Sequence, residues 1–442
     1  MGISHIHQKL KKLPSSFLLA LGFFCIILLG TFLLMLPFST TKAISPIDAL
    51  FIATSAVCVT GLSPIEICST LTLFGQIVLM SLFQIGGLGY AILLVSLISI
   101  TNGTLSFKNK LLVRESFGVD NRTNTKEIIK FVLISTFICE ALGTILLSAA
   151  FFPQYGNRGI FIALFTAVSA FNNAGFDLFG NSLISYNDSA LVLLTVASLI
   201  IIGGLGFLVL RELLIPQRHR IRLSVHTKIV LLMTIILLLS GTVGFIITQK
   251  LSVVEAFFQA VTTRTAGFCS FDQSILTPKA YVLTIFLMFI GASPCSTGGG
   301  IKTTTLFTAL GSCFSLLKGK DFIVFKRYIS KDTVIKALFI FLVAVLMIFF
   351  SCMILSFSEP DIPLSALFYE VVSALATVGL SQNITSLLSA TSKLIIIFLM
   401  YIGRVGILTI LSCFSSEAKH IEYLEGKVIV GSKNIELLQL LD

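Results

Sequence analysis

Residues 49–62 read ALFIATSAVCVTGL, and segments of the same kind return three more times along the chain. Each is a short run of small and aromatic residues that leads to a glycine. The other three read ALFTAVSAFNNAGF at 163–176, AFFQAVTTRTAGF at 256–268 and ALFYEVVSALATVGL at 366–380. A helix of about ten to twelve residues crosses only half of a bilayer core of about 30 Å. We therefore expect each segment to enter the membrane and return to the same side.

The composition indicates that a bilayer surrounds most of the chain. Hydrophobic residues make up 55% of the 442 residues and charged residues 12%, whereas soluble domains are about 25% charged. Spanning helices are expected at eight places: 17–36, 71–100, 128–152, 189–213, 229–250, 279–317 (interrupted), 334–357 and 391–414. The first is expected to be a retained span, not a cleaved signal peptide. The nine cysteines show no metal-ligand spacing, so neither a disulfide framework nor a transition-metal site is expected.

The distribution of Lys and Arg predicts the orientation of the chain in the membrane. Most of the 31 lie in or next to the connections 1–15, 101–127, 214–228, 318–333 and the tail from 415. The connections on the other side hold only Lys42, Arg158, Lys250, Arg264, Lys279 and Lys393. This asymmetry places the basic connections and both termini in the cytoplasm. Membrane topology therefore explains the net charge of +10, and no nucleic-acid partner is expected.

Together these features predict an all-α integral membrane protein of four membrane–pore loop–membrane repeats around one central pore. The expected boundaries are a cytoplasmic N-terminus at 1–15, repeats at 16–100, 128–213, 229–317 and 334–414, and a cytoplasmic tail at 415–442. Non-helical backbone at membrane depth is tolerated only where protein or a water-filled cavity satisfies its polar groups. Where four such backbone segments surround one axis, their carbonyl oxygens can replace the hydration shell of a cation. The alternative is that Gly61, Gly175, Gly267 and Gly379 are ordinary turn glycines.

Charged residues outside the basic connections support a cation pathway. The outer connections are expected to form an acidic vestibule that concentrates cations, from Asp48, Glu66, Asp177, Asp188, Glu255, Asp272, Glu359, Asp361 and Glu370. Arg404 and Glu140 lie within predicted spans, where a charge costs at least about 2.5–3.5 kcal/mol on insertion scales. We therefore expect Arg404 to face a cavity or a carbonyl partner. The sequence suggests no partner for Glu140.

These motifs resemble those of the Trk/Ktr/HKT family of potassium transporters, and specifically the membrane subunit of Ktr-type uptake systems. TSAVCVTGL (54–62), NNAGF (172–176), TRTAGF (263–268) and ATVGLS (376–381) are similar to its four filter segments. QIGGLG (84–89), IIGGLG (201–206) and IGRVG (402–406) are similar to its inner-helix motifs. The resemblance covers nearly the whole chain. It implies potassium uptake across the cell membrane through a filter with one glycine per repeat.

The resemblance also implies which residues form the ion pathway. The filter residues would be Cys58, Val59, Thr60, Gly61, Asn173, Ala174, Gly175, Thr265, Ala266, Gly267, Thr377, Val378 and Gly379. The segment GASPCSTGGGIKTTT (291–305) would carry an intramembrane gating loop at 291–303. The gating residues would be Pro294, Gly298, Gly299, Gly300, Lys302 and Arg404. By the same resemblance, Arg404 would donate hydrogen bonds to carbonyl groups of 293–300. A kink for packing is the alternative for this segment, because proline and glycine do not sustain a helix.

Partners and competing functions follow from the same motifs. By the resemblance, the tail would pack in a homodimer, and the cytoplasmic loops would face a cytosolic ring of nucleotide-binding regulatory subunits. No covalent cofactor is expected, and GGGIKT is not a P-loop because Ile301 separates the glycines from Lys302. Potassium is the expected substrate, while sodium permeation and activation by sodium stay open. A sodium-coupled carrier, an intramembrane enzyme and a non-conducting sensor are the alternatives. An enzyme is disfavoured because all five histidines lie in predicted cytoplasmic segments.

Overall fold

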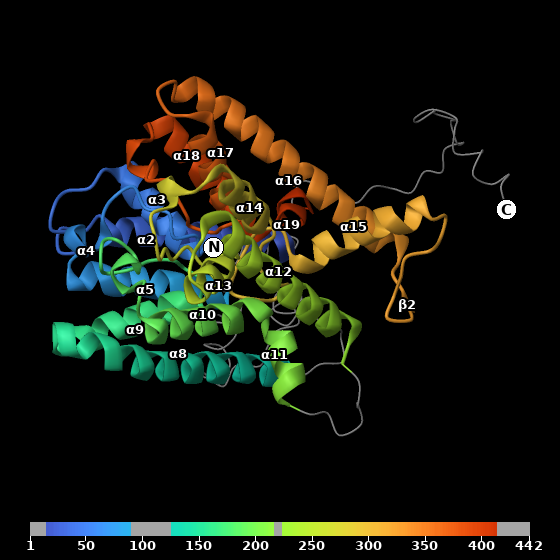
Figure 1. Cartoon of the computed structure of the whole chain (residues 1–442). Helices are drawn as coiled ribbons and strands as arrows, with labels where there is room; N and C mark the ends of the chain where they lie inside the picture. Colours follow the sequence, from blue (N-terminus) through green and yellow to red (C-terminus); the bar gives the residue numbers. More distant parts are fainter. Residues whose placement is uncertain (1–14, 90–124, 216–222, 413–442) are drawn as a thin grey trace, which may run out of the picture.

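The computed structural model describes residues 15–89, 125–215 and 223–412, which are almost entirely helical (Figure 1). A long helix followed by a short helix and then by further helices recurs four times. The first two groups are α2 (Ser15–Leu34), α3 (Pro46–Val57), α4 (Ile67–Thr70) and α5 (Leu73–Leu88), then α8 (Thr125–Tyr155), α9 (Asn157–Phe171), η1 (Ile184–Tyr186), α10 (Ala190–Leu205) and α11 (Phe207–Leu214).

The third and fourth groups follow the same order and are joined by a small hairpin. The third has α12 (Val225–Gln249), α13 (Val253–Thr262), η2 (Gln273–Ile275), α14 (Pro278–Phe289) and α15 (Thr303–Leu317). The antiparallel strands β1 (Ile323–Val324) and β2 (Arg327–Tyr328) come next. The fourth has α16 (Lys331–Ser358), α17 (Leu364–Leu375), η3 (Thr385–Leu387), α18 (Ala390–Val405) and α19 (Ile407–Ser412). α8 and α16 lie on opposite sides of the molecule in Figure 1.

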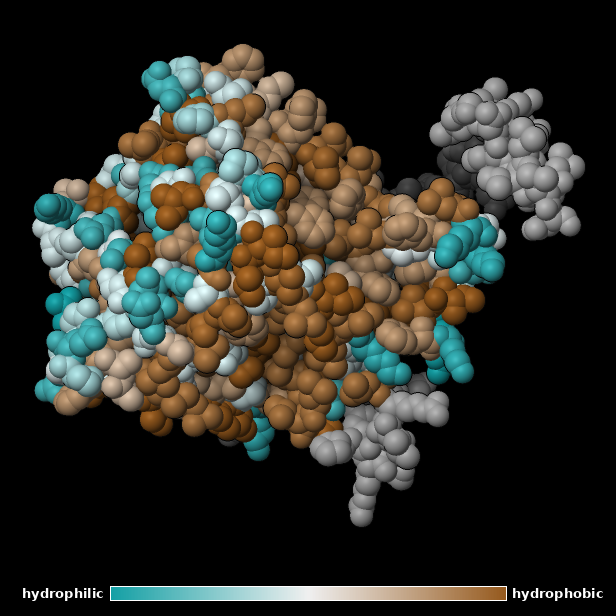
Figure 2. Space-filling view, viewed as in Figure 1, coloured by the Kyte–Doolittle hydropathy of each residue, from teal (hydrophilic) through white to brown (hydrophobic). Residues whose placement is uncertain are grey.

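Four helices in the described ranges are long and apolar enough to cross a membrane, namely α2, α8, α12 and α16. The pair α10 and α11 meets the same test jointly, with a bend of 98° between them. Exposed apolar side chains such as Phe32, Ile145 and Phe349 cover these helices, and Figure 2 shows a broad hydrophobic surface. Hydrocarbon tails would cover such a surface. Length alone therefore identifies five of the eight expected spans.

The short helices α3, α9, α13 and α17 lie largely in the protein interior, and their starts are defined by local sequence. Ser45 caps α3 by accepting a hydrogen bond from the backbone N–H of Asp48, and Pro46 occupies the first turn. Ser252 and Glu255 form a reciprocal capping box at the start of α13. Because all four helices are only 10 to 15 residues long, they end inside the molecule.

Glycines of the GGLG and GRVG motifs let three later helices approach the ends of these short helices. A Cβ built on Gly86, Gly203 or Gly403 would collide with a carbonyl oxygen. The oxygens belong to the last residues of α3, α9 and α17, which are Val57, Phe171 and Leu375. The first glycine of each motif is therefore needed for close packing, because any side chain would push the two helices apart.

Two helices that the sequence predicts as continuous are broken. The expected helix 189–213 turns at Gly206, where φ is 94°, and the expected helix 391–414 turns at Gly406, where φ is 95°. Gly89 ends α5 with φ 80°, and the rest of the expected helix 71–100 lies outside the described residues. Left-handed backbone of this kind is readily adopted only by glycine. The predicted interruption within 279–317 is confirmed, because α14 ends at Phe289 and α15 begins at Thr303.

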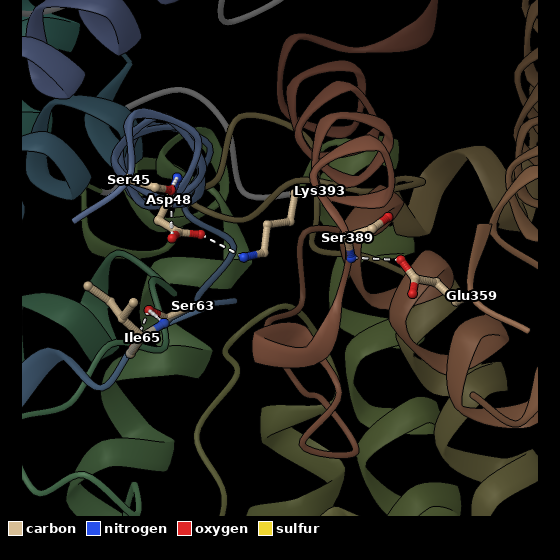
Figure 3. Close-up of polar contacts among 7 residues, drawn as sticks. All are labelled: Ser45, Asp48, Ser63, Ile65, Glu359, Ser389 and Lys393. Atoms are coloured by element: carbon tan, nitrogen blue, oxygen red, sulfur yellow. Dashed lines mark hydrogen bonds and ion pairs between the residues drawn. The ribbon is translucent and has the colours of Figure 1, made fainter. Parts of the chain in front are cut away.

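An ion pair joins the first and last groups of helices. Nζ of Lys393 on α18 lies 2.7 Å from Oδ1 of Asp48 on α3, and the two side chains are 14% and 18% exposed. Figure 3 shows Lys393 extending to Asp48 beside Ser45. Close by, the backbone N–H of Ser389 donates to Glu359 at 2.7 Å. The ion pair joins residues that are 345 positions apart in the sequence.

We expect Lys393→Met to lower the free energy of unfolding by about 1–3 kcal/mol, because it leaves the charge of Asp48 without its partner in a half-buried site. The combined variant Asp48→Asn/Lys393→Met should regain part of this loss. The measurement is a double-mutant cycle, in which thermal unfolding of the purified wild type and variants is followed in detergent. Arg211→Met is the control, because its partner Glu127 is 63% exposed and lies 3.4 Å away. Additive losses in the cycle would show that the pair is not coupled.

Candidate functional site

The glycines of the four repeated segments meet in the interior. A Cβ built on Gly61 would lie 2.7 Å from the carbonyl oxygen of Ala174 and 3.1 Å from Cα of Gly175. The other glycines face the next segment in the same way: Gly175 faces Ala266 at 2.7 Å, Gly267 faces Val378 at 2.6 Å, and Gly379 faces Thr60. These contacts run from the first segment to the fourth and back to the first. The four segments therefore form a closed ring, which we call the glycine ring.

The backbone of each segment has an unusual conformation. Each glycine has positive φ, from 71° to 98°, and so does the residue two positions before it. Those residues are Val59 (57°), Asn173 (59°), Thr265 (76°) and Thr377 (51°). Positive φ is uncommon for residues other than glycine and is a strain worth about 1–3 kcal/mol. Positive φ at two positions of each segment distinguishes its backbone from a β-strand, in which φ is negative.

Hydrogen bonds to the preceding short helix hold each segment. Backbone N–H groups just before the glycines donate to helix carbonyls: Thr60 to Ser55, Ala174 to Ser169, Ala266 to Thr262 and Val378 to Ser373, at 2.7–3.0 Å. The third link spans four residues where the others span five, so its segment is shorter by one residue. The hydroxyls of Ser55 and Ser373 also accept from the N–H groups of Gly61 and Gly379, each at 3.1 Å. Cys58 is not in the left-handed stretch, because it is the C-cap of α3.

An open cavity of about 640 Å³ lies on one side of the glycine ring and includes all four glycines in its wall. Of the nine acidic residues expected in a vestibule, only Glu66, Asp177 and Asp272 line it. The backbone N–H of Ser274 and the Asn383 amide hold the pKa of Asp272 below its usual value. Burial raises the pKa of Asp177. Asp272 therefore carries a negative charge at the cavity wall at neutral pH.

Other acidic residues of the predicted vestibule have structural partners instead. Asp48 pairs with Lys393, Glu255 belongs to the capping box of α13, and Glu359 accepts from the N–H of Ser389. Glu370 is fully buried in α17 and accepts from the Thr385 hydroxyl at 2.5 Å. The expectation of a vestibule with nine acidic residues was therefore too broad. The sequence alone does not show which acidic residues cap a helix, which are buried and which line the cavity.

The segment between α14 and α15 lies against the opposite side of the glycine ring. A Cβ on Gly298 would collide with the Thr265 hydroxyl, and one on Gly299 would collide with that of Thr377. The Thr377 hydroxyl accepts from the N–H of Gly299 at 3.1 Å. Further backbone bonds join the segment to α10 and α18, from Ser293 to Gly204, Thr297 to Gly203 and Gly300 to Gly403, each at 3.2 Å. The carbonyl of Pro294 faces Gly206, where a Cβ would lie 2.5 Å away.

Two cationic side chains lie beneath the ring beside this segment. Nη1 of Arg404 donates to the carbonyl of Thr297, as the sequence predicts for 293–300. Nη2 donates to the carbonyls of Gly86 and Gly87, which sequence reasoning missed because they are 317 or more residues away. Nζ of Lys302 donates to the carbonyl of Gly298 at 2.7 Å. Both side chains line a cavity of about 290 Å³, together with Gly298 and Gly300.

Glu140, for which the sequence offered no partner, has two. Nε2 of Gln84 on α5 donates to Oε2 of Glu140 at 3.2 Å. Nδ2 of Asn172, the C-cap of α9, donates to Oε1 at 3.1 Å. Glu140 is 5% exposed, so these amides provide the hydrogen bonds that a buried carboxylate needs. The two amides lie 56 and 32 positions away from Glu140, which is why local patterns could not identify them.

The chain is similar to proteins that transport cations. A family model described as TrkH, cation transport protein, matches residues 15–423. The Ktr system potassium uptake protein B of Bacillus subtilis (strain 168) is 39% identical, over 93% of this chain and 96% of that protein. The potassium/sodium uptake protein NtpJ of Enterococcus hirae is 37% identical, over 95% and 98%. A solved structure, the potassium transporter TrkH from Vibrio parahaemolyticus, has a similar fold, with a TM-score of 0.67 and 21% identity over 89% of this chain and 84% of that chain.

We expect Gly379→Ala to destabilise the protein more than Gly319→Ala. Both positions have left-handed backbone, with φ 95° and 60°, where a non-glycine residue costs roughly 1–2 kcal/mol. Gly319 has no atom within 4 Å of a built Cβ, whereas Gly379 would meet the carbonyl of Thr60. The check compares melting temperatures of the two purified variants. Equal melting temperatures would contradict a closed ring at Gly379.

Proposed function

Because the chain belongs to the TrkH family of cation transport proteins, we propose that it takes up potassium across the cell membrane. The pathway is a filter with one glycine from each of four repeats. The glycine ring carries this proposal, because it brings four segments with the same backbone conformation to one place between two cavities. A mere turn glycine has no reason to contact the glycine of another repeat.

Ion selection rests on backbone carbonyl groups of the four segments. The oxygens of residues 58–61, 173–175, 265–267 and 377–379 would replace water around a dehydrated cation. α3, α9, α13 and α17 each end within five residues of the ring glycine, so the negative ends of their dipoles lie next to it. Each such helix end stabilises a cation by roughly 0.3–1 kcal/mol. The charge of Asp272 attracts cations into the outer cavity.

The segment 291–303 is the proposed gate. It contacts the underside of the ring at Thr265 and Thr377, and Arg404 is bonded to its Thr297 carbonyl. The guanidinium group of Arg404 below the filter repels a cation that leaves it. Lys302 lies beside the same segment, with Nζ bonded to the Gly298 carbonyl. Opening requires the segment to release its backbone bonds to α10 and α18 and the bond from the Gly299 N–H to the Thr377 hydroxyl, and to move Gly298 away from Thr265.

Sodium transport is the second candidate. The relative from Enterococcus hirae is named for both potassium and sodium. The four segments of this chain also differ in sequence, so their side chains do not form four identical layers. A less uniform set of carbonyl ligands discriminates less between the two ions. Competition between the two ions for uptake separates these candidates, and the same experiment tests activation by sodium.

Assembly and orientation complete the proposal. The cavity of about 640 Å³ faces the outside of the cell, and the cavity of about 290 Å³ beside Arg404 faces the cytoplasm. This orientation agrees with the positions of the basic connections. A homodimer and a cytosolic ring of nucleotide-binding subunits, as Ktr-type systems imply, would control the gate from that side. The tail at 415–442, where we expect the dimer contact, lies outside the described residues.

We expect purified protein in liposomes to accumulate rubidium or potassium down a membrane potential. Gly61→Ser should lower the preference for potassium over sodium about tenfold, equivalent to about 1.4 kcal/mol, because its side chain meets the Ala174 carbonyl. Gly319→Ser is the matched control outside the ring. Unchanged ion preference in folded Gly61→Ser protein would contradict the filter.

We expect Arg404→Ala to raise the rate of potassium flux several-fold, because it removes a positive charge and the hydrogen bond to Thr297 that links the gate segment through Arg404 to Gly86 and Gly87 of α5. Flux is measured in the same liposomes, without any added partner. Arg211→Ala removes an arginine that pairs with Glu127 away from the gate segment and should leave the flux unchanged. A lower flux in well-folded Arg404→Ala protein would show that the arginine does not block the pathway.

A further inference from the structure

A polar cluster, in which Glu140 and Asn172 are buried, lies beside the second segment of the glycine ring, and the pathway described above does not use it. Its members are Gln84 on α5, Glu140 on α8 and Asn172 at the end of α9. Nδ2 of Asn172 donates to Oε1 of Gln84 at 2.5 Å and to Oε1 of Glu140 at 3.1 Å. Nε2 of Gln84 donates to Oε2 of Glu140 at 3.2 Å. The three side chains form a triangle of hydrogen bonds from three helices.

Asn172 is the member next to the second filter segment. It directly precedes Asn173, the left-handed residue of the second segment. Nδ2 also lies 2.9 Å from the carbonyl of Val168, so its two N–H groups are shared among three acceptors, and the amide cannot turn away without losing them. On the other side, a Cβ on Gly87 would collide with Oδ1 of Asn172. The side chain of Asn172 therefore contacts Gln84 and Glu140 through Nδ2 and the backbone of α5 at Gly87 through Oδ1.

The same turn of α5 binds Arg404. Nη2 of Arg404 donates to the carbonyls of Gly86 and Gly87. Both residues thus contact Gly87. The side chain of Asn172 packs against its Cα, and the guanidinium group of Arg404 donates to its carbonyl oxygen. A displacement of Asn172 would change the space available to Gly87 and with it the acceptors of Arg404.

We infer that Glu140 is a positioning residue for the second filter segment and for Arg404. With Gln84 it fixes the amide of Asn172, which in turn sets the start of the segment at Asn173 and the position of Gly87. This inference rests on the proposed function, because it assigns the cluster a role in ion selection. It adds a residue in α8 that does not itself contact the glycine ring.

The triangle allows an exchange test. In Glu140→Gln, the new amide N–H₂ must face either the Gln84 N–H₂ or the Asn172 N–H₂, so at least one bond is lost. In the double variant Gln84→Glu/Glu140→Gln the two residue types exchange places. The carboxylate at position 84 then accepts from Asn172 and from the amide N–H₂ at position 140. The amide oxygen at position 140 accepts from Asn172, so all three bonds can form again.

The experiment measures rubidium uptake and its inhibition by sodium in liposomes for the wild type, both variants and Glu127→Gln. Glu127 is a matched control on the same helix, with a 63% exposed side chain. We expect Glu140→Gln to lose about fivefold or more in the preference for rubidium over sodium, and the exchanged variant to return within about twofold of wild type. A general loss of folding would lower uptake of both ions equally, whereas misplacement of the segment changes their ratio.

Two results would overturn the inference. One is a wild-type ion preference in Glu140→Gln, and the other is an exchanged variant that folds but keeps the defect of the single variant. If the wild type transports neither ion, the proposed function fails, and the cluster is then judged from melting temperatures. A lower melting temperature in Glu140→Gln that the exchange restores supports the hydrogen-bonded triangle, and failure to restore it contradicts the triangle.

Discussion

Backbone N–H and C=O groups that leave helical geometry inside a membrane protein need partners, and this requirement governs the centre of the molecule. The segment between α14 and α15 meets it with backbone bonds to glycines of α10 and α18 and with the Thr377 hydroxyl. The four ring segments meet it through bonds to their own short helices. Glycine is what makes these bonds reachable, because a Cβ at Gly203 or Gly403 would keep the backbones apart. Packing and hydrogen bonding are therefore satisfied by the same small residues.

Much of the central arrangement follows from local sequence, since it depends on residues close together in the chain. The four segments leading to glycine and the break around 291–303 were predictable in this way. The carbonyl partner of Arg404 lies 107 positions away, and it was expected only from the family resemblance. The turns at Gly206 and Gly406 were not, because GGLG and GRVG inside apolar runs also fit a continuous helix. Left-handed Val59 and Thr377 carry no local signal, because neither residue type favours that conformation. Partners of Glu140 and the second acceptor site of Arg404 depend on contacts between distant helices, which one sequence does not reveal.

The four repeats share one backbone plan but differ in the side chains that support it. Serine hydroxyls brace the first and fourth segments, whereas the third uses a link one residue shorter. The second segment begins at Asn172, whose amide is held by Gln84 and Glu140. Behind the fourth, Glu370 accepts from Thr385. The common backbone explains how the segments close a ring, and the different supports mean that each segment can be altered separately.

The position of Arg404 illustrates what a single chain with internal repeats permits. In the motifs GGLG, GGLG and GRVG, Arg404 occupies the place held by Gly87 and Gly204. A pore assembled from four copies of one shorter chain would carry either no arginine at this level or four, and four would accumulate a charge that no cation could pass. In a single chain with four repeats, the repeats need not be identical, so one of them can carry an arginine that the others lack. An arginine that only one repeat carries can then be bound to carbonyls of two other repeats, and it can change without the same change in the other three.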